Sequence, residues 1–311
     1  MSRPAAIRIV EVGPRDGLQN EAAVLAPQTR IAFIEALAAA GLTAIEAGSF
    51  VSPRHVPQMA ETDRVLAGLS LPPSVELPVI VPNAHGFAAA RAAGARSIAV
   101  LATASETFGR RNINRGIAES LAESQPLVRE ALAAGLCVRG YISCVLGCPY
   151  EGAVPVARVV EVALALAEMG CAEVSLGDTI GVGTPDAARA LVAAVAAEIG
   201  IGRVALHFHD TYGQALANVL ACLDLGVATI DTSAAGLGGC PYAPGASGNL
   251  ATEDLVYMLD GLGVSTGIDL QRLAAAGALA CAALDTRPRS RTALALAGQA
   301  DGEAKQCSTA V

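Results

Sequence analysis

Two histidines separated by one residue are the most informative chemical feature of this 311-residue sequence. His207 and His209 lie at the end of a short apolar run, residues 204–208, and side chains two residues apart in a strand point to the same face. Two adjacent imidazoles form half of a binding site for a divalent metal ion. The alternative is a pair of hydrogen-bonded core histidines. The whole chain has only four histidines, and two of them lie here.

Oxygen ligands for the same ion are available in distant parts of the chain. Asp16 could supply a carboxylate oxygen and Asn249 an amide oxygen. Nitrogen and oxygen ligands without a thiolate favour Mg²⁺ or Mn²⁺, with Co²⁺ or Zn²⁺ as further options. Taken alone, Asp16 could equally be a turn or cap residue. Its interpretation as a ligand therefore depends on the histidine pair.

Other polar residues could stabilise charge or move a proton. The guanidinium of Arg15 could hold an oxyanion or an enolate in a dry site, and it could also form a salt bridge to Glu46. Glu46 and Asp178 could be acid–base groups, or could orient Arg15 and the metal. Cys240 lies in a glycine-rich segment, residues 236–243. That segment could be a mobile lid whose thiol carries a proton, or a structural turn with a buried cysteine.

A repeated strand–helix pattern is expected to position these residues. Short runs rich in β-branched residues alternate about eight times with Ala-rich helical stretches that end at glycine, which favours a (β/α)8 TIM barrel with additional C-terminal helices. The glycine-rich phosphate loop of an open doubly wound sheet is not found after the first run. The expected strands are residues 7–12, 43–47, 77–81, 97–101, 137–143, 173–176, 204–208 and 227–231.

The active site of a TIM barrel lies at the carboxyl ends of its strands. The candidate residues would meet at that mouth although they are far apart in the chain. We expect residues 1–285 to form one catalytic domain with a lid loop at 235–248, and residues 286–311 to form a loose tail. The residues expected at the mouth are Arg15, Asp16, Glu46, Asn112, Arg139, Tyr141, Asp178, His207, His209 and Asn249.

Composition argues against several functional classes. The net charge of −8 and the lack of a basic cluster argue against nucleic acid as a partner. No uncharged run of 18 apolar residues indicates a membrane span. The eight cysteines form no C-x-x-C pair and the start of the chain shows no targeting signal, so we expect a cytoplasmic protein without a disulfide framework.

Several segments resemble motifs of the 3-hydroxy-3-methylglutaryl-CoA lyase family. The similarity covers roughly residues 7–285. The pairs Arg15-Asp16 and His207-x-His209 would by themselves indicate only the wider superfamily of Claisen-type synthases and aldolases, whereas the segment around Cys240 indicates the lyase. The matching segments are residues 10–21 (VEVGPRDGLQNE), 49–53 (SFVSP), 140–152, 175–185 (SLGDTIGVGTP), 209–218 and 236–254.

The resemblance implies an activity and a set of site residues. The activity is the cleavage of 3-hydroxy-3-methylglutaryl-CoA, a coenzyme A thioester, to acetyl-CoA and acetoacetate with Mg²⁺ or Mn²⁺, as in leucine degradation and ketone-body formation. Because barrels of this kind commonly pair, we expect a homodimer. The implied metal ligands are Asp16, His207, His209 and Asn249; the catalytic residues are Arg15, Glu46, Asp178, His207 and Cys240; and the substrate-binding residues are Arg15, Gln19, Ser49, Asn112, Arg139, Tyr141 and Ser175.

The sequence departs from the family pattern at a few positions. Ala47-Gly48 follow Glu46 where members often carry two threonines, and Phe208 stands where cysteine is common in animal members. These changes would open the pocket, so a lyase acting on a longer 3-substituted 3-hydroxyglutaryl-CoA is an alternative. Cys307 could be a redox thiol between subunits, although the residues around it match the family poorly.

Three other functions are weighed against the lyase. A Claisen-type synthase would usually need a regulatory C-terminal domain, for which we expect no room. An aldolase would lack the Cys240 segment. A barrel kept as a binding or scaffold module would have lost its metal and acid–base residues, and here the set is intact.

Overall fold

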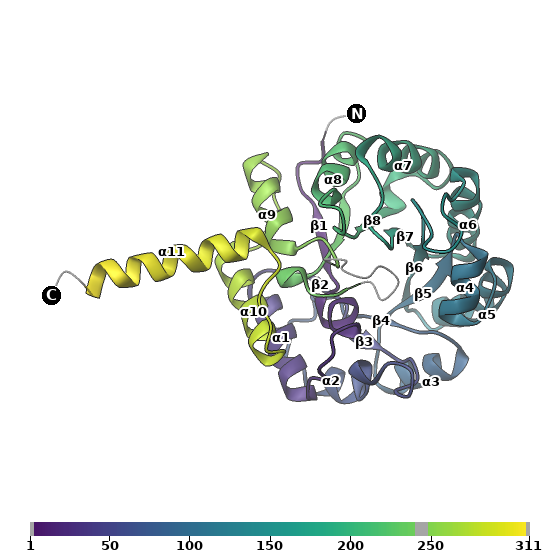
Figure 1. Ribbon diagram of the computed structural model, residues 1–311. Helices are drawn as coiled ribbons and strands as arrows, with labels where there is room; N and C mark the ends of the chain where they lie inside the picture. The colour runs from purple at the N-terminus through teal and green to yellow at the C-terminus, as the bar shows by residue number, and fades with distance from the viewer. Residues whose placement is uncertain (1–2, 240–247, 309–311) are drawn as a thin grey trace.

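A parallel sheet that curls into a barrel forms the centre of the protein (Figure 1). The computed structural model describes residues 3–239 and 248–308, and side chains as far as residue 299. The strand order in the described residues is β2-β1-β9-β8-β7-β6-β5-β4-β3. The strands are β1 (Arg8–Glu11), β2 (Ala44–Ile45), β3 (Gly48–Ser49), β4 (Pro78–Ile80), β5 (Ser97–Thr103), β6 (Cys137–Ser143), β7 (Glu173–Asp178), β8 (Val204–Phe208) and β9 (Thr229–Thr232).

The barrel closes through a single strand that is divided into β2 and β3. β2 pairs with β1, and β3 pairs with β4. The backbone N–H of Ile45 in β2 donates to the carbonyl of Glu76, and that of Ala47, between β2 and β3, donates to the carbonyl of Pro78. Both halves therefore reach the next strand, and the TIM barrel predicted from the repeated pattern is confirmed.

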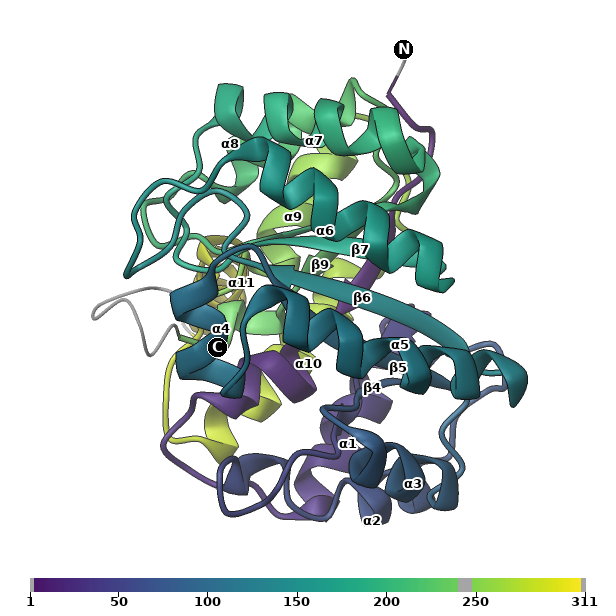
Figure 2. The same cartoon turned by 90° about the vertical axis from the view of Figure 1, so that its right-hand side faces the viewer.

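Helices surround the barrel and bury its outer face (Figures 1 and 2). Parallel strands are covered on both faces, so their sequences are almost continuously apolar; all five residues of β8 are buried. The helices present matching stripes of small and branched residues to the sheet. They are α1 (Pro27–Ala39), α2 (Thr62–Gly68), α3 (Ala84–Ala92), α4 (Glu106–Ile113), α5 (Ile117–Ala133), α6 (Val156–Met169), α7 (Pro185–Ile199), α8 (Ala215–Leu223), α9 (Thr252–Gly261) and α10 (Leu270–Ala283).

The C-terminal segment differs from the expected loose tail. Residues Arg291–Ser308 form helix α11, which extends away from the barrel (Figure 1). The carboxylate of Asp254 in α9 accepts hydrogen bonds from the backbone N–H of Thr292 at 2.8 Å and from the hydroxyl of Ser290 at 2.8 Å, which fixes the start of the helix. The segment is rich in Ala and also contains Leu and Gln, which have high helix propensity. The expectation of a loose tail was therefore wrong for these residues.

Candidate active site

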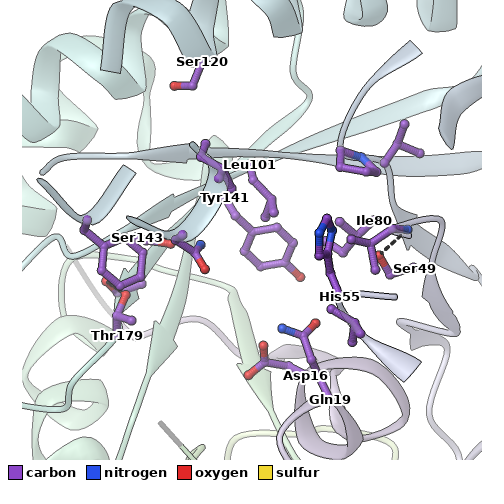
Figure 3. A pocket seen from close by; sticks show the side chains of 18 of the residues that line it. Asp16, Gln19, Ser49, His55, Ile80, Leu101, Ser120, Tyr141, Ser143 and Thr179 are labelled. Atoms are coloured by element: carbon purple, nitrogen blue, oxygen red, sulfur yellow. Dashed lines mark hydrogen bonds between the residues drawn. The ribbon is translucent and has the colours of Figure 1, made fainter. Parts of the chain in front are cut away.

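A cavity of about 780 Å³ lies at the carboxyl ends of the strands, where the barrel fold predicts an active site. Figure 3 shows how its side chains converge from separate strands and loops. The expectation that distant segments meet here is confirmed for most of the candidates. The predicted site residues that line the cavity are Arg15, Asp16, Gln19, Ser49, Asn112, Tyr141, His207 and His209.

Three of the predicted metal ligands form a compact buried cluster. The Nε2 atoms of His207 and His209 are 3.3 Å apart, and Asp16 Oδ2 lies 3.8 Å from each of them. The three ligand atoms lie within 4.8 Å of one another. His207 lies on the inner face of β8 and His209 follows directly after the end of that strand, whereas Asp16 lies on a single helical turn after β1, Gly13–Gly17. Two nitrogens and a carboxylate oxygen that face one point can hold a divalent cation.

The fourth predicted ligand lies beside this cluster with its amide nitrogen turned inward. Asn249 Nδ2 donates to Asp16 Oδ2 at 2.9 Å and to the carbonyl of Leu237 at 3.3 Å. The oxygen and nitrogen of an amide can exchange places by a half-turn of the group. Such a turn would present the amide oxygen to the ion, so the place of Asn249 fits the prediction, and its role as a ligand stays a prediction.

The protonation of this cluster suits a cation. Burial would raise the pKa of Asp16, but the positive charge of Arg15 and the charges that the two histidines carry when protonated lower it well below its usual range. Burial and the neighbouring charge of His207 lower the pKa of His209 to about 4. Asp16 is therefore ionised and His209 is neutral at neutral pH, and these are the forms that bind metal ions.

Arg15 forms the ion pair with Glu46 that was considered for it, and a second ion pair with Asp16. Its Nε is hydrogen-bonded to Glu46, and its Nη1 lies 2.5 Å from Asp16 Oδ1. Burial would lower the pKa of Arg15, but Glu46 and Asp16 raise it, so the guanidinium stays charged. Burial raises the pKa of Glu46 despite the opposing charge of Arg15. Arg15 is thus a fixed cation on the cavity wall, beside the metal-ligand cluster.

The turn that carries Arg15 and Asp16 depends on glycine. A Cβ atom on Gly13 would lie 2.5 Å from Glu11 Oε1, and one on Gly17 would lie 2.7 Å from Ser233 Oγ. The carboxylate of Glu11 accepts hydrogen bonds from the backbone N–H groups of Gly13 and Ala234, both at 2.8 Å. The turn is therefore packed directly against the segment that follows β9.

A buried carboxylate that sequence reasoning missed lies directly behind His207. Asp231 in β9 pairs in register with His207 in β8, and its Oδ2 lies 3.2 Å from His207 Nδ1. Arg139 Nη2 and Ser175 Oγ donate to the same carboxylate at 2.5 and 2.7 Å. Burial would raise the pKa of Asp231, but Arg139 lowers it to about 2. One available signal was an acidic residue at the end of an expected strand, residues 227–231.

Arg139 and Ser175 lie behind the cavity wall in the described part of the chain. Arg139 donates to the hydroxyl of Tyr141 at 2.8 Å and pairs with Glu173 at 2.7 Å. The hydroxyl of Tyr141 in turn donates to Glu46 at 3.1 Å. The structure thus assigns the two residues to the network that supports the site, and direct contact with substrate stays a prediction for both.

The carboxylate of Asp178 faces the loop after β7. It accepts hydrogen bonds from the backbone N–H groups of Val182 at 3.2 Å and Gly183 at 2.8 Å. Burial raises its pKa to about 6, although these N–H groups oppose the shift. In the described residues Asp178 therefore holds a loop and does not orient Arg15. A catalytic role for it stays a prediction.

Of the remaining predicted residues, Ser49 and Asn112 line the cavity, and Cys240 is not described. Ser49 Oγ accepts a hydrogen bond from the backbone N–H of Val51 at 3.3 Å, and Asn112 reaches the cavity from helix α4. Cys240 lies outside the described residues, as does most of the predicted lid loop. Gly239, just before it, lines the cavity, and its carbonyl accepts a hydrogen bond from the Asn20 side chain at 2.8 Å.

The expected widening of the pocket was wrong. Phe208 alternates with the histidines, so its ring points outward into the core between sheet and helices and is 1% exposed. A Cβ atom on Gly48 would meet Thr62 Oγ1 at 2.6 Å and Arg30 Nη2 at 2.8 Å, on the side of helix α2. Ala47 is also part of that core. None of these residues lines the cavity, so they give no support to a longer substrate.

Comparisons with known proteins agree with this geometry. The HMGL-like family model matches residues 6–280. The mitochondrial hydroxymethylglutaryl-CoA lyase of Bos taurus is 56% identical over 292 residues, 94% of this chain and 90% of that protein. The structure of hydroxymethylglutaryl-CoA lyase from Pseudomonas aeruginosa is 52% identical with a TM-score of 0.94, covering 96% of this chain and 100% of that one. An HMG-CoA lyase from Acinetobacter baumannii, in complex with coenzyme A and 3-methylmalate, is 34% identical with a TM-score of 0.89, covering 94% and 95%.

Proposed function

This chain belongs to the HMGL-like family, and from that premise we propose that it is a 3-hydroxy-3-methylglutaryl-CoA lyase. The enzyme cleaves its substrate to acetyl-CoA and acetoacetate. One observation carries the proposal: the Asp16, His207 and His209 cluster lies beside the Arg15–Glu46 ion pair at one barrel mouth. Since the departures from the family pattern lie outside the cavity wall, the longer substrate is not favoured.

The residues of the cluster fit a divalent cation. Two imidazoles and an ionised carboxylate converge there without a thiolate, and Asn249 is placed to add an amide oxygen. When bound, the cation would act as a Lewis acid toward the hydroxyl and carbonyl oxygens of the substrate. We propose Mg²⁺ or Mn²⁺ because half of this ligand set is oxygen, and Co²⁺ and Zn²⁺ are chemically compatible with it.

Arg15 would stabilise the negative charge that develops when the carbon–carbon bond breaks. A base takes the proton of the tertiary hydroxyl, the bond between C2 and C3 breaks, and its electron pair passes into the enolate of the acetyl thioester. The hydroxyl-bearing carbon becomes the ketone of acetoacetate. A guanidinium fixed by two carboxylates, as Arg15 is by Glu46 and Asp16, is preorganised to bind the enolate oxygen.

A proton must then reach C2 of the enolate. We propose Cys240 as its donor, with His207 as the alternative. Gly239, the residue before Cys240 in the sequence, lines the cavity and accepts a hydrogen bond from Asn20. His207 lines the cavity, but its Nδ1 is hydrogen-bonded to Asp231.

The cavity wall offers polar contacts for a coenzyme A thioester. Gln19, Ser49 and Asn112 lie around it with Tyr141, and these are the proposed contacts of the acyl group. Arg111 also lines the cavity, with its guanidinium 4.2 Å from the ring centre of Tyr150. A local cation of this kind can attract an anionic thioester although the protein carries a net charge of −8.

Other properties stay proposals. No helix in the described residues is long and apolar enough to cross a membrane. We retain a homodimer in the cytoplasm, although the Bos taurus relative is named as mitochondrial. We also retain residues 1–285 as the catalytic unit and 286–311 as an appended segment. Sedimentation of the purified protein tests the dimer.

Thioester cleavage by chelator-stripped protein tests the function. We expect Mg²⁺ or Mn²⁺ to restore the release of acetyl-CoA from 3-hydroxy-3-methylglutaryl-CoA, and a 3-ethyl analogue to react more slowly. His209→Ala should lose the restored activity, whereas His85→Ala, which changes an exposed histidine outside the cavity wall, should keep it. Cleavage of the analogue alone would reassign the substrate, and cleavage of neither compound would refute the proposal.

A further inference from the structure

Asp231 distinguishes the two histidines of the cluster. His207 Nδ1 lies 3.2 Å from Asp231 Oδ2, whereas His209 Nδ1 is buried without a hydrogen-bond partner among the described residues. A carboxylate can only accept a hydrogen bond, so the proton of a neutral His207 belongs on Nδ1. The lone pair of Nε2 then faces His209 and Asp16.

We propose that Asp231 is a positioning residue that fixes His207 in the Nδ1–H tautomer and so prepares Nε2 as a metal ligand. This inference rests on one part of the proposed function, namely that the cluster of Asp16, His207 and His209 binds a metal ion. A carboxylate behind a ligating histidine sets its tautomer and raises its basicity, and removal of such a partner typically weakens metal binding by about 10–100-fold.

The orientation of Asp231 is itself fixed from two sides. Arg139 Nη2 donates to Oδ1 at 2.5 Å, and Ser175 Oγ donates to Oδ2 at 2.7 Å. Arg139 is held in turn by Glu173 at 2.7 Å and by the hydroxyl of Tyr141 at 2.8 Å. The Asp231 side chain is fully buried, so water does not compete for these contacts.

This arrangement makes Asp231→Asn a specific probe. Arg139 carries only donors, so the amide oxygen of the new residue must take the place of Oδ1. The amide NH₂ then takes the place of Oδ2 and donates to His207 Nδ1. The imidazole must accept there, its proton moves to Nε2, and that N–H points at Asp16 and His209. The substitution thus inverts the tautomer while it keeps the shape of the side chain.

The tautomer can be measured without metal or substrate. We would record ¹⁵N NMR spectra of histidine-labelled, metal-free protein at about pH 9, well above the usual titration range of imidazole. Four histidines are present, and His55→Gln and His85→Gln help to assign them. We expect His207 to carry its proton on Nδ1 in the unmodified protein and on Nε2 in Asp231→Asn.

Metal affinity provides the second readout, by competition of Co²⁺ with a coloured chelator. We expect Asp231→Asn to bind Co²⁺ about 10–100-fold more weakly, and Thr229→Val, which changes the neighbouring inward position on β9, to bind within about twofold of the unmodified protein. An Nε2–H proton on His207 of the unmodified protein would overturn the proposal even if the variant failed to fold. Unchanged Co²⁺ affinity in a folded Asp231→Asn protein would overturn it too. Because neither readout measures cleavage, a wrong substrate assignment would leave both results intact.

Discussion

Removing one oxygen atom from Tyr141 tests the polar network beneath the active site. The hydroxyl accepts from Arg139 at 2.8 Å and donates to Glu46 at 3.1 Å, and Tyr141 is 6% exposed. Hydrogen bonds to charged groups contribute about 1.5–3 kcal/mol each. In the variant, Arg139 is still hydrogen-bonded to Asp231 and Glu46 is still hydrogen-bonded to Arg15, so part of the loss is compensated. We therefore expect Tyr141→Phe to lower the free energy of unfolding by about 2–4 kcal/mol.

The expected loss can be converted into a melting temperature. An unfolding entropy of about 2.1 cal/mol/K per residue over a chain of this length turns that loss into a decrease of roughly 3–6 °C. Urea unfolding and thermal unfolding would be measured on chelator-stripped protein, so that metal binding does not contribute. Tyr257→Phe is the matched control because Tyr257 is 67% exposed, and it should change the stability by less than about 0.5 kcal/mol. Equal stabilities of the two variants would refute the idea that the Tyr141 hydroxyl joins Arg139 to Glu46.

Three further predictions follow from single contacts. Burial raises the pKa of Glu253 to about 8 from 4.5 in the unfolded chain. Its protonated form therefore stabilises the fold fully below about pH 4.5, and this contribution is lost as the pH rises to about 8. Urea unfolding across that range should show a decline in stability that is smaller for Glu253→Gln by roughly 5 kcal/mol, and parallel curves would contradict it. Phe208→Leu should lower the free energy of unfolding by about 1–2 kcal/mol. The kcat/KM for the methyl substrate divided by that for the ethyl substrate should stay unchanged. A changed ratio would show that Phe208 does shape the pocket. Asp254→Ala removes the hydrogen bonds that fix the start of α11. The variant should have a lower helix content, measured by circular dichroism, and a free energy of unfolding lower by about 1 kcal/mol. Identical spectra and unfolding curves would mean that this cap is dispensable.

The sequence by itself determined the fold class and most of the chemistry of the site. Repeated strand–helix units with glycine after each helix have few compact arrangements other than a barrel, and strand alternation places His207 and His209 on one face. The motifs around Arg15-Asp16 and Cys240 added the family, which the comparisons confirmed. These features involve residues that are close together in the chain, so they can be recognised from the sequence alone.

Tertiary structure alone decided which polar groups meet across the barrel. The sequence places Asp231 in a strand, but its contact with His207 depends on the register between β8 and β9. Arg139 and Asp178 were taken as site residues from their places in and after strands and from the family resemblance. Side-chain directions put Arg139 behind the cavity wall and turned Asp178 toward a loop. Gly48 faces helix α2, which its own segment did not indicate. Which side chains face each other depends on the pairing between segments far apart in the chain, and the pattern within one strand does not give it.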